Sequence, residues 1–345
     1  MKKILSLIMA AAMILCLLAG CGSTPAPAVK EDPAPADKGD AAPPDADYSY
    51  HWKLATTETS DYYMTVLAQE FLDMVNERTG GKVTGEVFAS GQLGGLVDAL
   101  EGLELGTVDI VMDGFSSLGE VNPIFDAWGM PYLYDSQEHR YSFWDNHFDE
   151  CADLVANEAN IRMVTVIDGL NRNLSCTKEV NSLEDLKGLK IRVPTITTYM
   201  RVWECFGTAP VPMALSEVYT SIQNNVVDGQ ENDIMLTMAM NFYEVCPYAI
   251  MTEHVPYEGS LFFNEETFQS YPEELQQIIL EVGREITAKS RTVVSGEEEK
   301  TLAKMEEMGV TIIRPDLEEF REATRVMYEE NTDIAPVISL IDKAR

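Results

Sequence analysis

The chain has 345 residues, of which 46% are apolar, so it is long enough for two domains with real cores and too apolar for a disordered protein. Its 57 acidic and 25 basic residues give a net charge of −32. Because such a surface is repelled by phosphate backbones and anionic membrane surfaces, the composition argues against a nucleic-acid partner.

The first 20 residues have the layout of a signal peptide. Lys2 and Lys3 precede the apolar run Ile4–Leu18, which is shorter than the roughly 20 apolar residues of a transmembrane helix. The sequence LAGC then leads to Cys21 and resembles a bacterial lipobox, which implies that Cys21 is lipidated and becomes the mature N-terminus. Ordinary secretion with an incidental Cys21 is the alternative.

Residues 21–47 are expected to form a lipidated, disordered tether. Thirteen of the 26 residues from 22 to 47 are Pro or Ala, and six are acidic. Proline and like charges extend such a segment, which has too few apolar side chains to build a core. A globular domain is therefore expected to begin near Tyr48.

The first half of this domain alternates strand and helix patterns, as in an α/β protein. Strands are expected at 52–55, 83–89, 108–112 and 163–167, and helices at 61–78, 93–105 and 138–159. Gly80-Gly81 and Gly106 end the first two helices.

The second half follows Gly169. We expect a helical turn at 183–186 with Ser182 as its N-cap, a helix at 216–225 capped by Ser216, a helix at 317–330, and strands at 190–193, 258–264 and 310–314. Pro272 opens a helical pattern that runs almost to Gly309. That length is unusual for a globular helix, so either one helix spans both halves or two helices meet near Ser295-Gly296.

Several motifs together resemble the solute-binding proteins of TRAP (tripartite ATP-independent periplasmic) transporters of the DctP type. They are LKGLKIRVP at 186–194, the run from Gly207 that ends in VVDGQEN at Asn232, FASGQLGG at 88–95 and FYEVCPYAIMTEH at 242–254. The resemblance covers the chain from about Tyr48 to its end.

The resemblance implies a two-lobed, periplasmic-binding-protein-like α/β fold. Each lobe would be a mixed β-sheet flanked by helices, with a long C-terminal helix spanning both. Lobe I is expected to hold residues 48–169 and 258–297, and lobe II residues 170–257 and 298–345. The lobes would close on a ligand about strands near Gly169 and Glu258.

The same resemblance implies an extracytoplasmic binding protein that captures a small organic acid and delivers it to an ion-gradient-driven membrane permease. The protein would be a monomer without a cofactor, lipid-anchored on the outer face of the cell membrane or periplasmic. A binding protein for another transport or sensor system is one alternative, and a secreted hydrolase is another. The acid itself stays open among C4-dicarboxylates, 2-oxo or hydroxy acids, sugar acids and sialic acids.

Three residues are the main candidates for the binding site. Arg192 ends a predicted strand, where α/β folds bind ligands, and its planar fork matches a carboxylate with two parallel hydrogen bonds. The resemblance makes Arg192 the grip on the ligand carboxylate, with Arg172 as a second positive charge and Asn232 as a further donor. A structural ion pair is the alternative for each arginine, and a turn for Asn232.

Weaker candidates follow other strands or helices. They are Asp113, Phe115, Thr57, Glu58, Leu215 and Tyr199. An acid such as Asp113 would accept hydrogen bonds from ligand hydroxyls or pair with an amine. Leu215 stands where relatives often carry an aromatic residue, and Tyr199, with Trp203, is otherwise a core residue.

Nothing in the sequence indicates catalysis. The four histidines form no H-E-x-x-H pair, and the chain has no G-x-G-x-x-G motif and no P-loop. Beyond Cys16 and Cys21 the cysteines are widely spaced without a C-x-x-C, so no metal site is expected. In an exported protein Cys151, Cys176, Cys205 and Cys246 can either pair or stay free, and their apolar surroundings favour free thiols.

Overall fold

The computed structural model describes residues 48–345. The predicted signal peptide, the lipidation site at Cys21 and the tether lie outside the described residues. Within residues 48–345, no helix combines the length and the apolarity that crossing a membrane requires.

Ten strands of the described domain form one mixed β-sheet. They are β1 (Tyr50–Ala55), β2 (Val83–Phe88), β3 (Ile110–Gly114), β4 (Ile161–Met163), β5 (Ile167–Cys176), β6 (Lys190–Val193), β7 (Ala209–Pro212), β8 (Gly229–Asn232), β9 (Tyr248–Asn264) and β10 (Thr311–Ile313). Their order is β2-β1-β3-β9-β5-β8-β6-β7, with β4 and β10 paired to β9.

Helices surround this sheet. The α-helices are α1 (Tyr63–Arg78), α2 (Leu96–Glu104), α3 (Gln137–Ala159), α4 (Thr197–Cys205), α5 (Val218–Gln223), α6 (Ile234–Ala239), α7 (Glu265–Ser270), α8 (Glu273–Val294), α9 (Glu297–Glu307), α10 (Leu317–Glu330) and α11 (Ala335–Lys343). Short 3₁₀ helices are η1 (Phe115–Glu120), η2 (Pro123–Gly129), η3 (Leu183–Leu186), η4 (Leu215–Glu217) and η5 (Phe242–Glu244).

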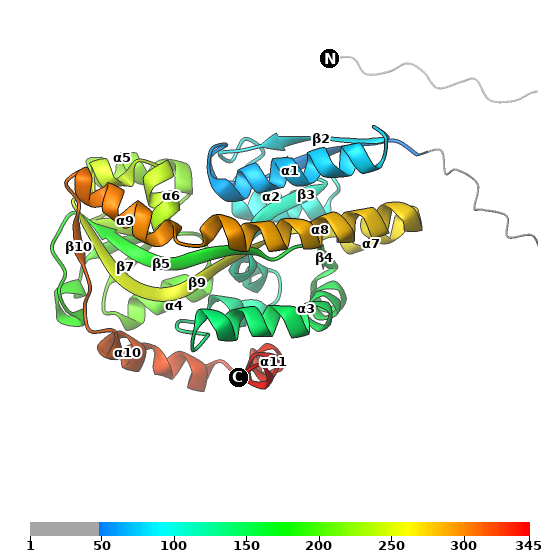
Figure 1. Ribbon diagram of the computed structural model, residues 1–345. Helices are drawn as coiled ribbons and strands as arrows, with labels where there is room; N and C mark the ends of the chain where they lie inside the picture. Colours follow the sequence, from blue (N-terminus) through cyan, green and yellow to red (C-terminus); the bar gives the residue numbers. More distant parts are fainter. Residues whose placement is uncertain (1–47) are drawn as a thin grey trace, which may run out of the picture. The chain divides into compact units, whose positions relative to one another are not determined.

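The sheet has two parallel ends joined by two long antiparallel strands. At one end β1 pairs in parallel with β2 and β3, and at the other β6 pairs in parallel with β7 and β8. Parallel neighbours need crossover connections, which α1 and α2 supply at the first end and α4 and α5 at the second. Figure 1 shows β5 and β9 running between the two ends. The fold is therefore two-lobed, and a single continuous sheet joins the two lobes through β5 and β9.

These two long strands are the main difference from the predicted elements. The strand expected at 163–167 falls on the gap between β4 and β5, and the one expected at 258–264 is only the end of β9. The second half of the domain was expected to follow Gly169, but β5 pairs with β9 on both sides of this glycine, through a register shift between Asp168 and Asn171. A Cβ on Gly169 would lie 2.4 Å from the carbonyl oxygen of Tyr257, so only glycine allows the strands this approach.

The long helical pattern after Pro272 is two helices, not one. Ser295 leaves the helix, and Gly296 has φ 71°, a left-handed conformation that favours glycine. Helix α8 packs against α1 and β5, whereas α9 packs against α6 and β10. The expected span from one lobe to the other is thus made by the pair of helices.

The cap predicted at Ser216 is also wrong, because Ser216 lies inside η4 and α5 begins at Val218.

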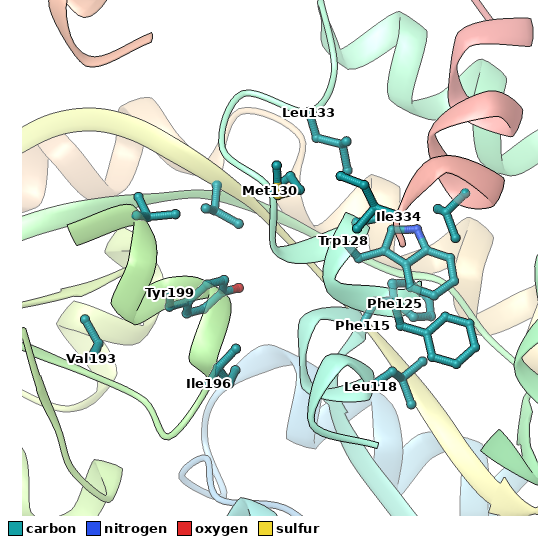
Figure 2. Packing of buried hydrophobic residues seen from close by; sticks show 14 of the residues in the cluster. Phe115, Leu118, Phe125, Trp128, Met130, Leu133, Val193, Ile196, Tyr199 and Ile334 are labelled. Atoms are coloured by element: carbon teal, nitrogen blue, oxygen red, sulfur yellow. The ribbon is translucent and has the colours of Figure 1, made fainter. Parts of the chain in front are cut away.

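The largest apolar core crosses from one end of the sheet to the other. Figure 2 shows Phe115, Phe125 and Trp128 on one side, with Val193 and Tyr199 on the other. Four cysteines of the described domain, Cys151, Cys176, Cys205 and Cys246, are free thiols, the alternative that their surroundings favoured.

Candidate functional site

A cavity of about 310 Å³ lies between the two ends of the sheet. Eight of the predicted site residues line it: Thr57, Glu58, Asp113, Arg172, Arg192, Tyr199, Leu215 and Asn232. Six of them lie at or just after the carboxyl ends of β1, β3, β6 and β8 or in the middle of β5, and strand ends are where an open α/β sheet presents side chains to ligands. The other two come from helices, Tyr199 from α4 and Leu215 from η4. Side chains far apart in the sequence therefore meet in one place.

Arg192 carries a buried charge that no acid of the described domain pairs with directly. Its side chain is 2% exposed, and both Nε and Nη2 donate to the carbonyl oxygen of Met213, at 3.0 and 2.7 Å. Burial lowers the pKa of Arg192 to about 9. The positive charge of Arg172 adds to this lowering, and the negative charge of Glu231 opposes it. The guanidinium is thus charged at neutral pH, and its Nη1 has no partner within residues 48–345.

Arg172 is held by a buried acid. Its Nε and Nη2 donate to the two carboxylate oxygens of Glu231 at 2.6 and 2.8 Å, and its guanidinium lies 5.0 Å from the ring centroid of Tyr199 and 5.1 Å from that of Tyr257. Burial alone would lower the pKa of Arg172, but the charge of Glu231 outweighs it and raises this pKa above its ordinary value. Arg172 is therefore both a structural ion partner and a wall of the cavity.

His254 completes this buried group. Its Nε2 lies 3.1 Å from Glu231, and its Nδ1 lies 2.9 Å from the hydroxyl of Thr252. Burial lowers the pKa of His254, against the opposing charge of Glu231. A neutral ring with its proton on Nε2 satisfies both contacts, since Nε2–H donates to Glu231 and Nδ1 accepts from Thr252.

Asn232 ends β8 and is 3% exposed. Its Oδ1 accepts a hydrogen bond from the backbone N–H of Asp233 at 3.2 Å. Asp233 in turn caps α6, accepting from the N–H groups of Met235 and Leu236. Asn232 is thus fixed in place, and its Nδ2 amide makes no hydrogen bond inside the described domain.

Two carboxyl groups also line the cavity. Glu58 is 3% exposed, accepts a hydrogen bond from the hydroxyl of Tyr257 on Oε1, and has a buried Oε2 without a partner among the described residues. Burial raises the pKa of Glu58 well above its ordinary value, with Asp113 and Asp233 adding to the rise. Asp113 accepts from the N–H of Gly114 at 2.6 Å, and burial raises its pKa to about 7.

Phe115 does not line the cavity, contrary to the prediction. Its ring is 1% exposed and stacks on Trp144 at 4.6 Å between centroids, in the core shown in Figure 2. Asp113 faces the cavity while Phe115 begins η1 and packs inward, because the chain turns into a 3₁₀ helix directly after β3.

Other lining residues were missed. Tyr257 orients Glu58, Ser116 contacts the hydroxyl of Tyr199 at 2.9 Å, and Met213 and Leu236 add apolar surface. Tyr257 lies in β9 between Pro256 and Glu258, and no pattern in the sequence marks it as a cavity residue. Within residues 48–345, no cluster of three or more His, Cys, Asp or Glu side chains is placed to hold a metal ion.

Known solute-binding proteins resemble this chain over most of its length. A solute-binding protein of Roseobacter denitrificans is 31% identical over 274 residues, covering 79% of this chain and 84% of the relative. The sialic acid-binding periplasmic protein SiaP of Vibrio cholerae is 30% identical over 264 residues, covering 76% of this chain and 82% of SiaP.

Solved structures share the fold. A TRAP periplasmic solute-binding protein of Roseobacter denitrificans with bound L-galactonate has a TM-score of 0.79 and 29% identity, covering 85% of this chain and 99% of that one. A TRAP protein of Pseudomonas putida with bound D-glucuronate has a TM-score of 0.80 and 25% identity, covering 85% and 97%. The family model of bacterial extracellular solute-binding proteins, family 7 (DctP), matches residues 54–333. The chain therefore belongs to this family, the solute-binding proteins of TRAP transporters.

Proposed function

We propose that Arg192 grips the carboxylate of a small organic acid in the cavity, with Asn232 and Arg172 as further donors. The observation that supports this most directly is the buried, unpaired charge of Arg192 beside the free Nδ2 amide of Asn232. A carboxylate that enters the cavity loses hydration, which charge-assisted hydrogen bonds replace. Relatives with bound D-glucuronate and L-galactonate, both carboxylates, support the same class of ligand.

Ligand capture is proposed to close two lobes. Lobe I would hold residues 48–169 and 258–297, and lobe II residues 170–257 and 298–345, with the closing motion near Gly169. A ligand that touches Arg192 on one side and the β1 and β3 ends on the other favours the closed state through its extra contacts there. The closed protein then delivers the acid to the TRAP membrane permease, as expected of a family of solute-binding proteins and not of enzymes.

The lipid anchor is part of the same proposal. Lipidation of Cys21 would keep the protein at the outer face of the membrane, close to the permease, on a tether of residues 22–47. Intact-mass measurement of the mature protein should show a diacylglyceryl-modified Cys21, and a soluble mature chain starting elsewhere would contradict it.

Arg192→Ala tests the proposed grip. Removing one buried ionic partner of a ligand typically costs about 2–5 kcal/mol, so affinity should fall at least tens-fold. Isothermal titration calorimetry with the organic acid that gives the largest thermal shift measures this. Arg192→Lys keeps the charge without the planar fork and should lose part of the affinity.

The control is Arg325→Ala, which removes an exposed arginine on α10. It should leave the affinity unchanged. Equal affinities of wild type and Arg192→Ala for the same acid, with both proteins folded, would reject the proposal.

A further inference from the structure

We infer that Arg140 is a positioning residue for lobe closure, which pairs with Asp168 in the conformation described here and gains a hydrogen bond to Glu258 when the hinge moves. The inference rests on the proposed function, because it concerns the closure that ligand capture is proposed to drive. None of the three residues lines the ligand cavity. Their effect on affinity therefore passes through the hinge and not through contact with the ligand.

The hinge cluster, made of Arg140, Asp168 and Glu258, lies where both long strands pass between the proposed lobes. Asp168 of β5 is paired with Glu258 of β9. The register then shifts, because β5 carries one residue more than β9 before the next pair, Asn171 with Pro256. Such a bulge interrupts the ladder and bends the strand. The cluster is therefore at the point where the two lobes can move relative to one another with the least loss of strand pairing.

The hinge cluster holds two acids and one cation, all of them buried. Because Asp168 and Glu258 are opposite each other on adjacent strands, their side chains share one face of the sheet, where like charges repel. Nη2 of Arg140 lies 2.8 Å from Oδ1 of Asp168, whereas Nε of Arg140 lies 3.6 Å from Oε1 of Glu258. One arginine thus has two acids within reach and pairs closely with only one of them.

The Nε–H group of Arg140 lacks a partner. It is buried and makes no hydrogen bond within residues 48–345, although buried polar groups are almost always satisfied in folded proteins. A hydrogen bond needs about 2.9 Å between nitrogen and oxygen, so a shift of Glu258 by about 0.7 Å toward Arg140 completes it. Oε1 of Glu258 already accepts from Nε1 of Trp144 and has a second lone pair for this bond. The missing partner is therefore one small hinge movement away.

Strand β9 connects the hinge cluster to the ligand cavity. Tyr257 lines this cavity and donates to Glu58, and Glu258 follows directly on the opposite face of the strand. A ligand that moves Tyr257 therefore moves Glu258 as well. A second cavity, of about 320 Å³ and lined by Arg140 and Pro256 among others, lies beside the cluster. It gives the strand room to move, which a close-packed interior would not.

The ionisation of Glu258 offers a second readout. The groups that face this carboxyl are Arg140, Trp144 and Cys151 of α3, Tyr134 before this helix and Asp168 of β5. Burial raises the pKa of Glu258 to about 7, and the charge of Arg140 opposes this rise. A new hydrogen bond from Arg140 favours the ionised form and lowers the pKa further. At pH 7 closure should therefore release part of a proton from Glu258.

A double-mutant cycle of Arg140→Lys and Glu258→Gln tests the inference by calorimetry. The probe is whichever of succinate, pyruvate, D-glucuronate and sialic acid gives the largest thermal shift. Each single variant should weaken binding about fivefold, because lysine cannot bond both acids and an amide loses the charge assistance. The double variant should also lose about fivefold and not about 25-fold, since both changes remove one shared bond. In buffers of different ionisation enthalpy, Glu258→Gln should release about half a proton less than wild type on binding at pH 7.

Arg162→Lys with Glu265→Gln is the matched control cycle. This pair has the same chemistry, since Nε and Nη2 of Arg162 donate to the carboxylate of Glu265 at 2.6 Å each, but it joins β4 to α7 inside the proposed lobe I. Its variants should lower the unfolding stability and leave the affinity unchanged. A purely structural role for the hinge cluster predicts the same result there.

Unchanged affinity in the folded Arg140→Lys and Glu258→Gln variants, or independent losses that multiply in the double variant, would overturn the inference and leave the grip by Arg192 standing. Should Arg140→Lys fail to fold, Glu258→Gln alone decides, through its affinity and its proton release. If none of the four acids binds, ligand capture itself fails and the inference with it.

Discussion

Two arginines of the same cavity have different physical roles at the scale of single residues. Arg172 has its charge matched by Glu231, whereas Arg192 donates only to a backbone carbonyl. The pattern K-I-R-V was enough to place Arg192 at the end of a strand, because strand ends are set by local sequence. The pairing of Arg172 with Glu231 was not predictable, since it depends on the register between β5 and β8, where Leu174 lies opposite Glu231.

Glu231→Gln should destabilise the protein strongly. The change leaves the buried guanidinium of Arg172 without a counter-ion, and breaking one side of a buried ion pair costs about 3–5 kcal/mol. Urea unfolding of wild type and variant without ligand measures the difference. Glu322→Gln removes an acid from an exposed pair with Arg325 and should cost under about 1 kcal/mol. A loss for Glu231→Gln as small as that of the control would contradict the argument.

Local sequence predicted many helices and strands and missed those whose conformation depends on pairing or packing with other elements. Apolar periodicity and the flanking glycines, prolines and caps predicted helices α1, α3 and α10 and strands β1, β2 and β6. Strands β7 and β8 and helices α6 and α11 were among the elements not predicted. Strand β7 contains Pro210 and Pro212 and β8 is the polar sequence GQEN, so neither has the pattern of a strand. Strands β5 and β9 contain Gly169 and Pro256, residues that ordinarily interrupt a strand and are here accommodated by register shifts.

Helix α4 closes one side of the cavity against η1 and η2. The hydroxyl of Thr198 donates to Asp126 at 2.6 Å, and the N–H of Thr197 donates to Glu120 at 2.6 Å, which also places an acid at the N-terminus of the helix. A Cβ on Gly129 would lie 3.1 Å from the side chain of Thr198, so glycine permits this close approach. Figure 2 shows the hydroxyl of Tyr199 pointing from α4 toward the side chains of η1 and η2.

Thr198→Val should therefore shorten the residence time of the ligand. The variant keeps the shape of the side chain and loses the hydrogen bond to Asp126, which is worth about 1 kcal/mol. If this hydrogen bond forms when the lobes close, its loss should raise the dissociation rate roughly fivefold. Stopped-flow displacement of the bound organic acid, the one that gives the largest thermal shift, measures this rate. Thr220→Val, at an exposed position on α5, is the matched control. A dissociation rate equal to that of the control would show that the contact is independent of closure.

The whole molecule carries a large excess of acid, yet its buried acids matter most for its response to pH. Burial raises the pKa of Asp113 and of Glu258 to about 7 each, and the charge of Arg140 opposes the rise at Glu258. In the unfolded chain such groups titrate near pH 4. Between about pH 4 and pH 7 the folded protein therefore holds more protons than the unfolded one, and its stability falls as pH rises through this window. Burial alone would raise the pKa of Glu231, but Arg172 and His254 hold this pKa below its ordinary value. Glu231 therefore affects the pH dependence of stability only at lower pH.

Asp113→Asn should flatten this dependence. The variant keeps the acceptor for the N–H of Gly114 and removes one titrating group, so the loss in unfolding free energy between pH 5 and pH 7.5 should shrink by about 1–2 kcal/mol. Urea unfolding at the two pH values, without ligand, gives the comparison. Glu77→Gln removes an exposed acid and should run parallel to wild type. If Asp113→Asn also runs parallel, Asp113 ionises as freely in the folded protein as in the unfolded chain and is charged at neutral pH in the empty cavity.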